Sequence, residues 1–221
     1  NFLLLRHDVE YSPIRAYQLA CLERRLNVFS SYFFQIRNNT YNLFSKENIQ
    51  ICKEIVKLGH KIGLHVHLGM LPKDFEIADL INLIRKDVNI MSEMLNMNID
   101  RFSYHRPESR ILLQDENFNG LINAYNKRYF TLCDNIDTIK PEQPKYLADS
   151  NHMWKTMHPL DLKVNSYKKI QLLTHPFSWT HRGYDNFENF YLLLSEKKKE
   201  LVKSVESEIK TFPANLRFCV K

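Results

Sequence analysis

Apolar residues in the first half of the chain follow two alternating patterns, continuous runs and longer stretches with helical spacing. The run at 2–5 stops at Arg6, as a buried parallel strand would, and residues 28–36 and 61–68 are rich in β-branched or aromatic side chains. The stretches between these predicted strands repeat apolar residues at helical spacing. Alternating strands and helices indicate a parallel sheet with right-handed crossovers.

Capping residues mark where the predicted helices begin and end. Ser12 followed by Pro13 predicts the start of the first helix, and Ser45 predicts the start of the second. Gly59 stands where a left-handed residue would end the second helix, and Pro72 opens a third. The first helix is expected to turn four apolar residues inward, Ala16, Leu19, Ala20 and Leu26.

The second half of the chain is less regular, with three further predicted strands and one long helix. The strands are expected at 102–105, 145–149 and 170–175, and the helix at 187–210. Five residues of this helix are expected to pack inward, Phe190, Leu193, Leu194, Leu201 and Val205. No linker or low-complexity segment divides the chain, so we expect a single domain over residues 1–221.

Composition narrows the class of protein. The content of 44% hydrophobic and 25% charged residues is typical of a soluble globular protein, and no apolar stretch is long enough to span a membrane. The net charge of +6 comes without interleaved aromatic residues, which argues against nucleic-acid binding. The basic runs are expected to be solvated helix faces, and composition leaves open whether they also suit an anionic substrate. The spacing of Cys21, Cys52, Cys133 and Cys219 excludes a zinc knuckle, and reduced thiols would fit a cytoplasmic protein.

Polar side chains gather at the ends of five predicted strands. A parallel sheet, whether closed into a barrel or open and doubly wound, collects functional groups at the carboxyl ends of its strands. The residues at these positions are Asp8, Glu10, His65, His67, His105, Arg106, Asp149 and His175. Their convergence from five strands predicts an active site.

Four of these residues have the chemistry of a metal site. Carboxylates and imidazoles are the ligands of catalytic divalent metals, and zinc takes three protein ligands and leaves a position for water. Asp8 and Glu10 lie two residues apart and could face one centre, as could His65 and His67. These four residues form the expected metal site.

Other residues have more than one interpretation. Arg106 could stabilise a developing oxyanion, and His175 could protonate a leaving amine. Trp154 and Trp179 are either core aromatics or walls of a sugar pocket. His67 is either a ligand or a solvated residue past the end of its strand.

Five stretches of the sequence resemble, in order, the motifs of the NodB-like polysaccharide deacetylases of carbohydrate esterase family 4. The stretches are Arg6–Glu10, Gly59–His65, Tyr104–Pro107, Tyr146–Ser150 with Trp154, and Leu172–Pro176. They cover nearly the whole chain. The WbmS-like subgroup, which is found with surface-polysaccharide biosynthesis, is the most similar part of the family.

The resemblance implies an α/β fold, a distorted (β/α) barrel with about seven parallel strands. It also implies a hydrolase that removes acyl groups from sugars with the help of a divalent metal, usually zinc. In that scheme Asp8 is the base or a ligand, His65 a ligand, Arg106 the residue that positions the base, and His175 the acid. The residues expected to contact substrate are His105, Asp149, Trp154 and Trp179.

Two departures from the family pattern leave the metal ligands open. The family has adjacent aspartates in its first motif, whereas one residue separates Asp8 from Glu10 here. Either Glu10 is the ligand and Asp8 the base, or Asp8 itself binds the metal. The second histidine of the family's metal site falls on Gly69, so that His67 or His105 must replace it.

We therefore expect an enzyme that hydrolyses amide bonds, removing an acetyl-type group from an amino sugar in bacterial polysaccharide or O-antigen biosynthesis. The substrate would be nucleotide-linked, lipid-linked or a polysaccharide. The alternatives are a deformylase, a cyclic-amide hydrolase and a non-catalytic saccharide-binding relative. A cytoplasmic location is expected, without nucleic acid or an integral membrane segment, and the sequence leaves the oligomeric state open.

Overall fold

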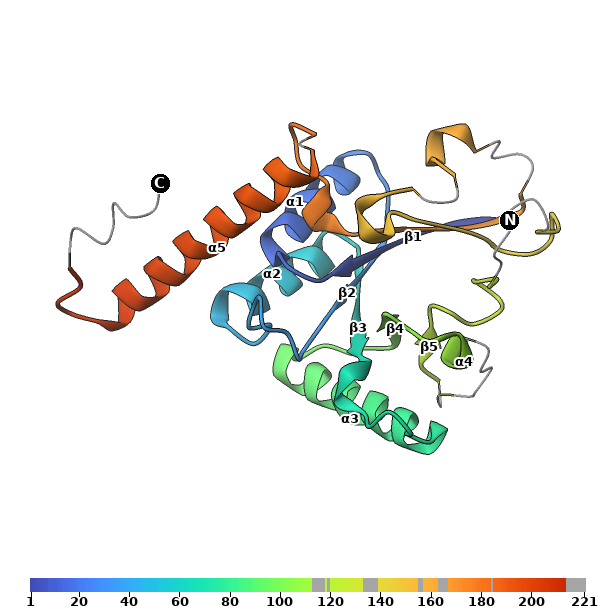
Figure 1. Cartoon of the computed structure of the whole chain (residues 1–221), viewed down its shortest axis with the longest axis horizontal. Helices are drawn as coiled ribbons and strands as arrows, with labels where there is room; N and C mark the ends of the chain where they lie inside the picture. The colour runs from blue at the N-terminus through green and yellow to red at the C-terminus, as the bar shows by residue number, and fades with distance from the viewer. Residues whose placement is uncertain are drawn as a thin grey trace.

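The computed structural model describes residues 1–112, 118, 120–132, 139–154, 157–162, 167–183 and 185–213. Seven strands within these ranges form one parallel sheet in the order β5-β4-β3-β2-β1-β7-β6. The sheet curls into a half-barrel with helices on its outer side (Figure 1). The expected α/β class, a distorted (β/α) barrel with seven parallel strands, is confirmed.

The strands and helices agree with the expected ones in number and order, except in the irregular region. The strands are β1 (Phe2–Val9), β2 (Ser31–Phe34), β3 (Lys61–His67), β4 (Arg101–His105), β5 (Ile122–Asn123), β6 (Lys145–Ala148) and β7 (Lys169–Thr174). The helices are α1 (Pro13–Arg25), α2 (Lys46–Lys57), α3 (Ile77–Leu95), α4 (Ser109–Leu112) and α5 (Asn186–Glu208). The sequence does not predict β5 and α4, because two and four residues are too few to show a period.

Capping chemistry explains most of the helix ends. The side chains of Ser12 and Ser45 each accept a hydrogen bond from the backbone N–H three residues later, as predicted. Gly59 has a φ of +97°, which confirms the expected left-handed end of α2. The prediction for Pro72 is wrong, because residues 72–75 form a turn and α3 begins only after a capping box at Glu76.

The burial of β1 is the reverse of the predicted one. Residues 2–5 were expected to be the buried part, yet Leu3 is 59% exposed, whereas residues 6–9 are all buried and belong to the strand. Register gives the reason. Residues 6–9 pair with β2, and Arg6 and His7 pair with β7 as well, but residues 2–5 pair with β7 alone. The apolar start of the strand therefore extends beyond the part of the sheet that other elements cover.

The long helix α5 packs far less than predicted. Figure 1 shows α5 running outward from the sheet toward the C-terminal end of the chain. Of its five residues expected to pack, only Leu193 is buried, and Leu194 is 68% exposed. Leu26, just after α1, is also exposed rather than inward-facing. Helical spacing identifies an apolar face but not what covers it. Within the described residues, no helix is both long and apolar enough to cross a membrane.

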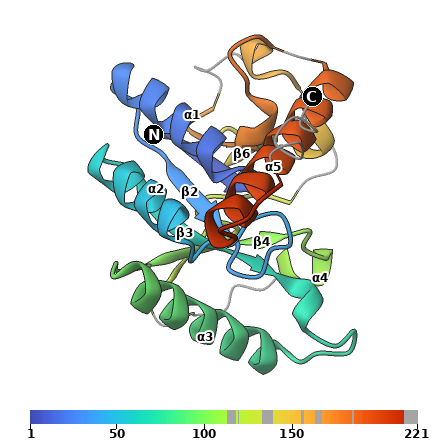
Figure 2. The same cartoon turned by 90° about the vertical axis from the view of Figure 1, so that its left-hand side faces the viewer.

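The hydrophobic core joins the sheet to the helices on its outer face. Phe34, Leu64 and Val66 belong to the strands of this core, and Ile55 and Ile84 to α2 and α3. Figure 2 shows α1, α2 and α3 following one another along the same side of the sheet. This packing leaves the carboxyl ends of the strands free to carry polar groups.

The two described cysteines are free thiols. Cys52 is buried, and Cys21 is half-buried. Burial raises the pKa of the Cys52 thiol to about 12, so this residue behaves as a small hydrophobic side chain. Cys133 and Cys219 lie outside the described residues.

Candidate active site

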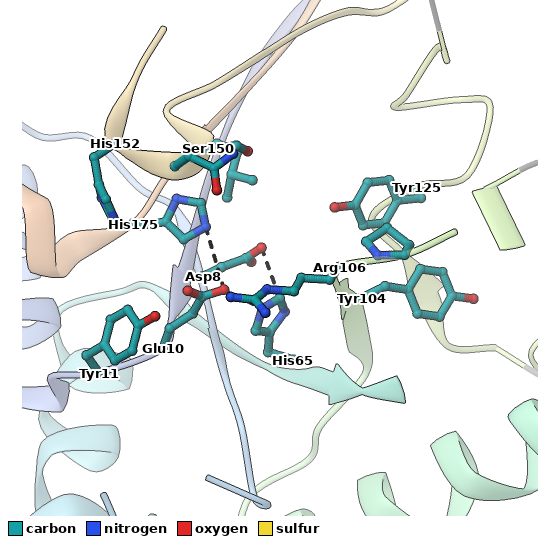
Figure 3. Close-up of a pocket in the computed structure, with 13 residues that line it drawn as sticks. Asp8, Glu10, Tyr11, His65, Tyr104, Arg106, Tyr125, Ser150, His152 and His175 are labelled. Carbon is teal, nitrogen blue, oxygen red and sulfur yellow. Dashed lines mark ion pairs between the residues drawn. The ribbon is translucent and has the colours of Figure 1, made fainter. Parts of the chain in front are cut away.

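A cavity of about 280 Å³ opens where the carboxyl ends of the strands meet (Figure 3). Its walls include Asp8 and Glu10 from the end of β1, His65 from β3, Arg106 after β4 and His175 after β7. Half-barrel curvature brings these residues together, although β1 and β4 are not neighbours in the sheet. The cavity is therefore the place where the polar strand ends converge.

Asp8 is paired with Arg6, which lies two residues earlier on the same strand. Arg6 Nε donates to Asp8 Oδ1 at 2.9 Å and Arg6 Nη2 donates to Oδ2 at 2.6 Å, so the pair is bidentate. Both side chains are buried. Burial tends to raise the pKa of Asp8, but the charge of Arg6 and then that of His65 outweigh it, leaving this pKa below its ordinary value. Asp8 is consequently an ionised carboxylate inside the cavity.

Ser103 on β4 determines which nitrogen of His65 carries the proton. Ser103 Oγ donates to Asp8 Oδ1 at 3.2 Å and lies 2.8 Å from His65 Nδ1. Because an ionised carboxylate only accepts, the single hydroxyl proton goes to Asp8, and His65 Nδ1 must then donate to Ser103. The lone pair of His65 is left on Nε2, a buried atom with no hydrogen-bond partner. Such an imidazole is oriented for a metal ion.

Within the described part of the chain, Glu10, His65 and His105 form a group that could hold a metal. Each offers one ligand atom, and the three atoms lie within 4.8 Å of one another. His105 Nδ1 is 2.8 Å from Glu10 Oε1, and His65 Nε2 is 3.5 Å from the same oxygen. Burial tends to raise the pKa of Glu10, but the hydrogen bond with His105 and the nearby imidazoles of His65 and His175 lower it well below the usual range. One carboxylate and two imidazoles are a donor set that zinc and similar divalent ions bind.

Two residues of the expected metal set lie beside this group rather than in it. The ring of His67 stacks on His105 with centroids 5.2 Å apart, because the two residues are direct partners in the β3–β4 register. Asp8 Oδ2 is 3.7 Å from the protonated Nδ1 of His65, on the side away from its lone pair. A side chain at Gly69 would place its Cβ 2.9 Å from the His67 ring, so a histidine there would displace His67.

His175 is held by Asp149 through two hydrogen bonds. His175 Nδ1 donates to Asp149 Oδ1 at 2.6 Å, and the His175 backbone N–H donates to Oδ2 at 3.0 Å. Burial tends to lower the pKa of His175, but the hydrogen bond and charge of Asp149 raise it by more. The pKa of His175 therefore lies above its ordinary value. The other ring nitrogen, Nε2, lies 3.8 Å from Glu10 Oε1 (Figure 3). A proton on this nitrogen would face the cavity.

Arg106 is not the partner of Asp8. It is exposed at the rim of the cavity, and within the described residues it forms no ion pair or hydrogen bond. Its φ is +50°, a conformation that costs about 1–2 kcal/mol in residues with a Cβ. Asn151 and His152, which also line the cavity, have φ values of +57° and +59°. Strained backbone therefore surrounds the opening, as is common at functional sites.

The two tryptophans lie outside the cavity wall. Trp179 is 47% exposed and donates from Nε1 to Asp149 Oδ2 at 2.8 Å, so it supports the residue that holds His175. The ring of Trp154 meets that of Trp179 edge to face, with centroids 6.2 Å apart. The pair forms an aromatic surface next to the site, neither core packing nor the lining of the cavity itself.

Arg6 and Ser103 contact the site residues but are not among the residues predicted from the sequence. A signal for Arg6 is present, because it lies two residues before Asp8 and alternate residues of a strand share a face. Ser103 carries no such signal. It reaches His65 because the two residues are partners in the β3–β4 register, which local sequence does not reveal.

No protein-family profile and no curated protein sequence matches this chain. Solved structures with a similar backbone include a CE4 family pseudoenzyme from Bacillus anthracis, which is 12% identical with a TM-score of 0.49. The match covers 90% of this chain and 61% of that one. This chain thus spans less than two thirds of the length of the first solved structures that it resembles.

Two further similar structures are a chitin deacetylase and an acetyl xylan esterase. The chitin deacetylase of the fungal pathogen Colletotrichum lindemuthianum is 14% identical, with a TM-score of 0.49 over 88% of this chain and 81% of that one. The family 4 acetyl xylan esterase of Clostridium thermocellum, solved with a cobalt ion, is 11% identical. Its TM-score is 0.47, over 90% of this chain and 85% of the esterase.

Proposed function

We propose that this chain is a metal-dependent hydrolase that removes an acetyl-type group from an amino sugar, as a polysaccharide deacetylase does. The observation that carries the proposal is the arrangement of Glu10, His65 and His105 within 4.8 Å of one another at the end of the half-barrel. An ionised Asp8 and a His175 with a raised pKa flank this group. We treat residues 1–221 as one NodB-like domain.

The donor set fits a divalent metal between Glu10, His65 and His105. His65 Nε2 is buried and lacks a hydrogen-bond partner, and Glu10 is ionised. A metal bound there would supply an activated water and a Lewis acid for the acyl carbonyl. Zinc is the ion that we propose, because one carboxylate and two imidazoles are a ligand set common in zinc enzymes.

Proton transfer is assigned to Asp8 and His175. The lowered pKa of Asp8 and the raised pKa of His175 are opposite shifts, the pattern of a base and an acid that share one site. Asp8 accepts the proton of the attacking water, and Arg6 holds the carboxylate in place for this step. His175 gives a proton from Nε2 to the leaving amine, while Asp149 stabilises the imidazolium before transfer.

The rim suits an anionic sugar substrate. Arg106 is exposed at the opening and can meet a phosphate of a nucleotide-linked or lipid-linked amino sugar. The exposed ring of Trp179, with Trp154 beside it, offers apolar faces for sugar rings. With the net charge of +6, these features support an intermediate of bacterial surface-polysaccharide or O-antigen biosynthesis, made in the cytoplasm.

Metal analysis together with acetate release tests the proposal. The purified chain is stripped with a chelator, reloaded with zinc or cobalt, and assayed with N-acetylated chitopentaose and with UDP-N-acetylglucosamine. We expect stoichiometric metal and acetate release that depends on it. Asp8→Asn should keep the metal and lower kcat by about 10²–10⁴-fold, the usual contribution of a general base. Asp100→Asn, a carboxylate paired with Arg101 away from the cavity, is the matched control and should change neither quantity.

Three other outcomes would contradict the proposal. Release of formate from formylated sugars, without release of acetate from acetylated ones, would identify a deformylase. Turnover confined to cyclic amides would identify a cyclic-amide hydrolase. Saccharide binding that a chelator leaves unchanged, without turnover of any acylated sugar, would identify a binding protein.

A further inference from the structure

We infer that Arg6 positions the base Asp8, and that Arg106 takes no part in holding it. The inference rests on the proposed function, in which Asp8 is the base. It concerns a residue inside the half-barrel, two positions before Asp8 on β1. The geometry assigns to Arg6 the role that the family resemblance implies for Arg106.

The contact between Arg6 and Asp8 fixes the carboxylate in two directions. The bonds from Nε and Nη2 reach different oxygens, at 2.9 and 2.6 Å, so the plane of the carboxylate cannot rotate without breaking one of them. Ser103 donates a third hydrogen bond, to Oδ1 at 3.2 Å. Oδ1 therefore accepts two hydrogen bonds from these residues and Oδ2 accepts one. Oδ2 is also the oxygen that lies 3.7 Å from His65. Oδ2 accepts only one of the three bonds, so it is the oxygen with more capacity left to accept a proton.

Arg6 is itself held on several sides. Its guanidinium lies 4.4 Å from the ring centroid of Tyr125 and 5.6 Å from that of Phe33. Arg6 Nη2 also donates to the Tyr125 hydroxyl at 3.0 Å, and Nη1 donates to Gln171 at 3.4 Å. Gln171 in turn donates to the backbone carbonyls of Ala124 and Tyr129. A guanidinium that is 2% exposed and this firmly supported is suited to positioning rather than to contact with substrate.

The two arginines differ in every property that bears on this role. Arg6 is buried, bidentate and surrounded by aromatic rings, whereas Arg106 is exposed and unpaired within the described part of the chain. Arg6 shares a strand and a face with Asp8, so any motion of β1 carries both residues together. Arg106 follows β4, three strands away in the sheet, on a strained backbone. Arg106 is accordingly free to bind the substrate.

Arg6→Lys is the main test, because lysine keeps the charge and loses the bidentate geometry. We expect kcat for acetate release to fall by about 10²-fold, the cost of a misplaced catalytic group, with KM and zinc affinity nearly unchanged. Arg106→Gln should instead raise KM for UDP-N-acetylglucosamine with little change in kcat. Arg101→Gln, an arginine paired with Asp100 outside the catalytic cavity, should leave both constants unchanged. Equal kcat for Arg6→Lys and the wild type would overturn the inference.

A second cavity makes a rescue experiment possible. This cavity of about 140 Å³ reaches the Arg6 side chain and is also lined by Leu4 and Leu5, at the opposite end of β1 from Asp8. In Arg6→Ala, added ethylguanidinium can enter from this side and replace the missing guanidinium. We expect it to restore part of kcat in a saturable manner, and to have no such effect on Asp8→Asn. Rescue equal in both variants would contradict a positioning role.

An NMR measurement separates failure of the inference from failure of the proposed function. The Nε–H signal of Arg6 should be shifted by its bond to Asp8 and should move in Asp8→Asn, while the Arg106 signal stays in place. If the wild type neither binds zinc nor releases acetate, the proposed function fails and the positioning role fails with it. If the wild type is active but the Arg6 Nε–H signal has the same chemical shift in Asp8→Asn, the inference alone is overturned.

Discussion

Strand β1 carries a polar network on each of its two faces, and only one of the two is complete. On the face toward α1, His7 Nε2 donates to Glu23 at 2.8 Å, and the hydroxyls of Ser30 and Tyr32 donate to the other oxygen of Glu23. His60 joins this network, accepting from the Ser30 backbone and donating to the Ala20 carbonyl at 3.0 Å. Each of these polar groups has a partner, so we refer to His7, Glu23, Ser30, Tyr32 and His60 as the closed network.

The network on the cavity face also contains histidine and carboxylate side chains, but one of its polar atoms has no partner. Asp8, Glu10 and His65 are bonded to their neighbours, yet His65 Nε2 has no hydrogen-bond partner. A cavity of about 280 Å³ adjoins these side chains, whereas the closed network links β1 to α1 through His7 and Glu23. Burying a polar atom without a partner costs about 1–3 kcal/mol, a cost that a bound ligand can offset.

Composition therefore does not distinguish a fully hydrogen-bonded network from one that keeps an unpaired polar atom. Both networks contain buried histidine and carboxylate, and His60 is even less exposed than His65. The two networks differ in whether every polar atom has a hydrogen-bond partner. A histidine with both nitrogens bonded has neither a lone pair nor a proton to offer, whereas His65 keeps one lone pair directed at Glu10. We therefore expect mutations in the two networks to damage different properties.

The largest expected effect is the contrast between His65→Ala and His60→Ala. His65→Ala should abolish stoichiometric zinc and lower acetate release by about 10³-fold, since the group that activates water is lost. His60→Ala should instead lower the free energy of unfolding by about 2–4 kcal/mol, because it leaves a cavity and unpaired backbone groups. Zinc per folded chain, read by metal analysis beside urea unfolding, should be unchanged in His60→Ala. Loss of zinc in both variants would remove the distinction between the networks.

A smaller effect is expected for the two serines that bond to histidine. Ser103→Ala should weaken zinc binding by about 10–100-fold, because it frees the tautomer and ring orientation of His65. Calorimetric titration of the metal-free chain with zinc measures this change. Ser30→Ala is the matched variant in the closed network and should lower stability without changing zinc affinity. Equal zinc affinity in Ser103→Ala and the wild type would show that Ser103 does not set the tautomer.

The smallest effect concerns the charge of Glu23. Burial tends to raise the pKa of this carboxyl, but the hydrogen bonds from His7, Ser30 and Tyr32 outweigh it, so the pKa is lowered in the fold. A carboxylate of this kind stabilises the fold above its unfolded pKa of about 4.3, and the stabilisation is lost as the pH falls through the folded value. Glu23→Gln should therefore lower the free energy of unfolding by about 1–2 kcal/mol at pH 7, and by less in acid.

Urea unfolding of Glu23→Gln at neutral and at acidic pH measures this difference. Glu54→Gln is the control, because Glu54 is also paired, with Lys57, but at the surface of α2. Exposed pairs contribute little, so this variant should unfold like the wild type at both pH values. A loss of stability in Glu23→Gln that is the same at both pH values would contradict a role for its charge.

Much of the fold can be predicted from local patterns. The caps at Ser12 and Ser45 and the left-handed Gly59 follow from side-chain chemistry within a few residues, and the structure confirms them. Predictions that depend on distant partners fare worse. The apolar start of β1 and the apolar face of α5 are exposed, because periodicity cannot show whether another element covers a face.

The candidate site also has a part that can be predicted from the sequence and a part that cannot. The strand ends that meet at the cavity are visible in the sequence, because parallel strands present their carboxyl ends on one side of a sheet. Which histidine joins Glu10 and His65 is not visible. His67 lies on the same strand as His65, yet His105 meets Glu10 because the sheet curls β4 toward the end of β1.

The sequence by itself determined the alternation of strands and helices, the parallel sheet, and the positions where Asp8, Glu10, His65 and His175 would converge. Only the tertiary structure decided the partners of these residues. Strand register placed Ser103 against His65, and the interior of the half-barrel fixed Arg6, rather than Arg106, on Asp8. The physical reason is the distance along the sequence between the residues that interact. Periods and caps reflect forces between residues a few positions apart, whereas register and curvature depend on the packing of the whole sheet.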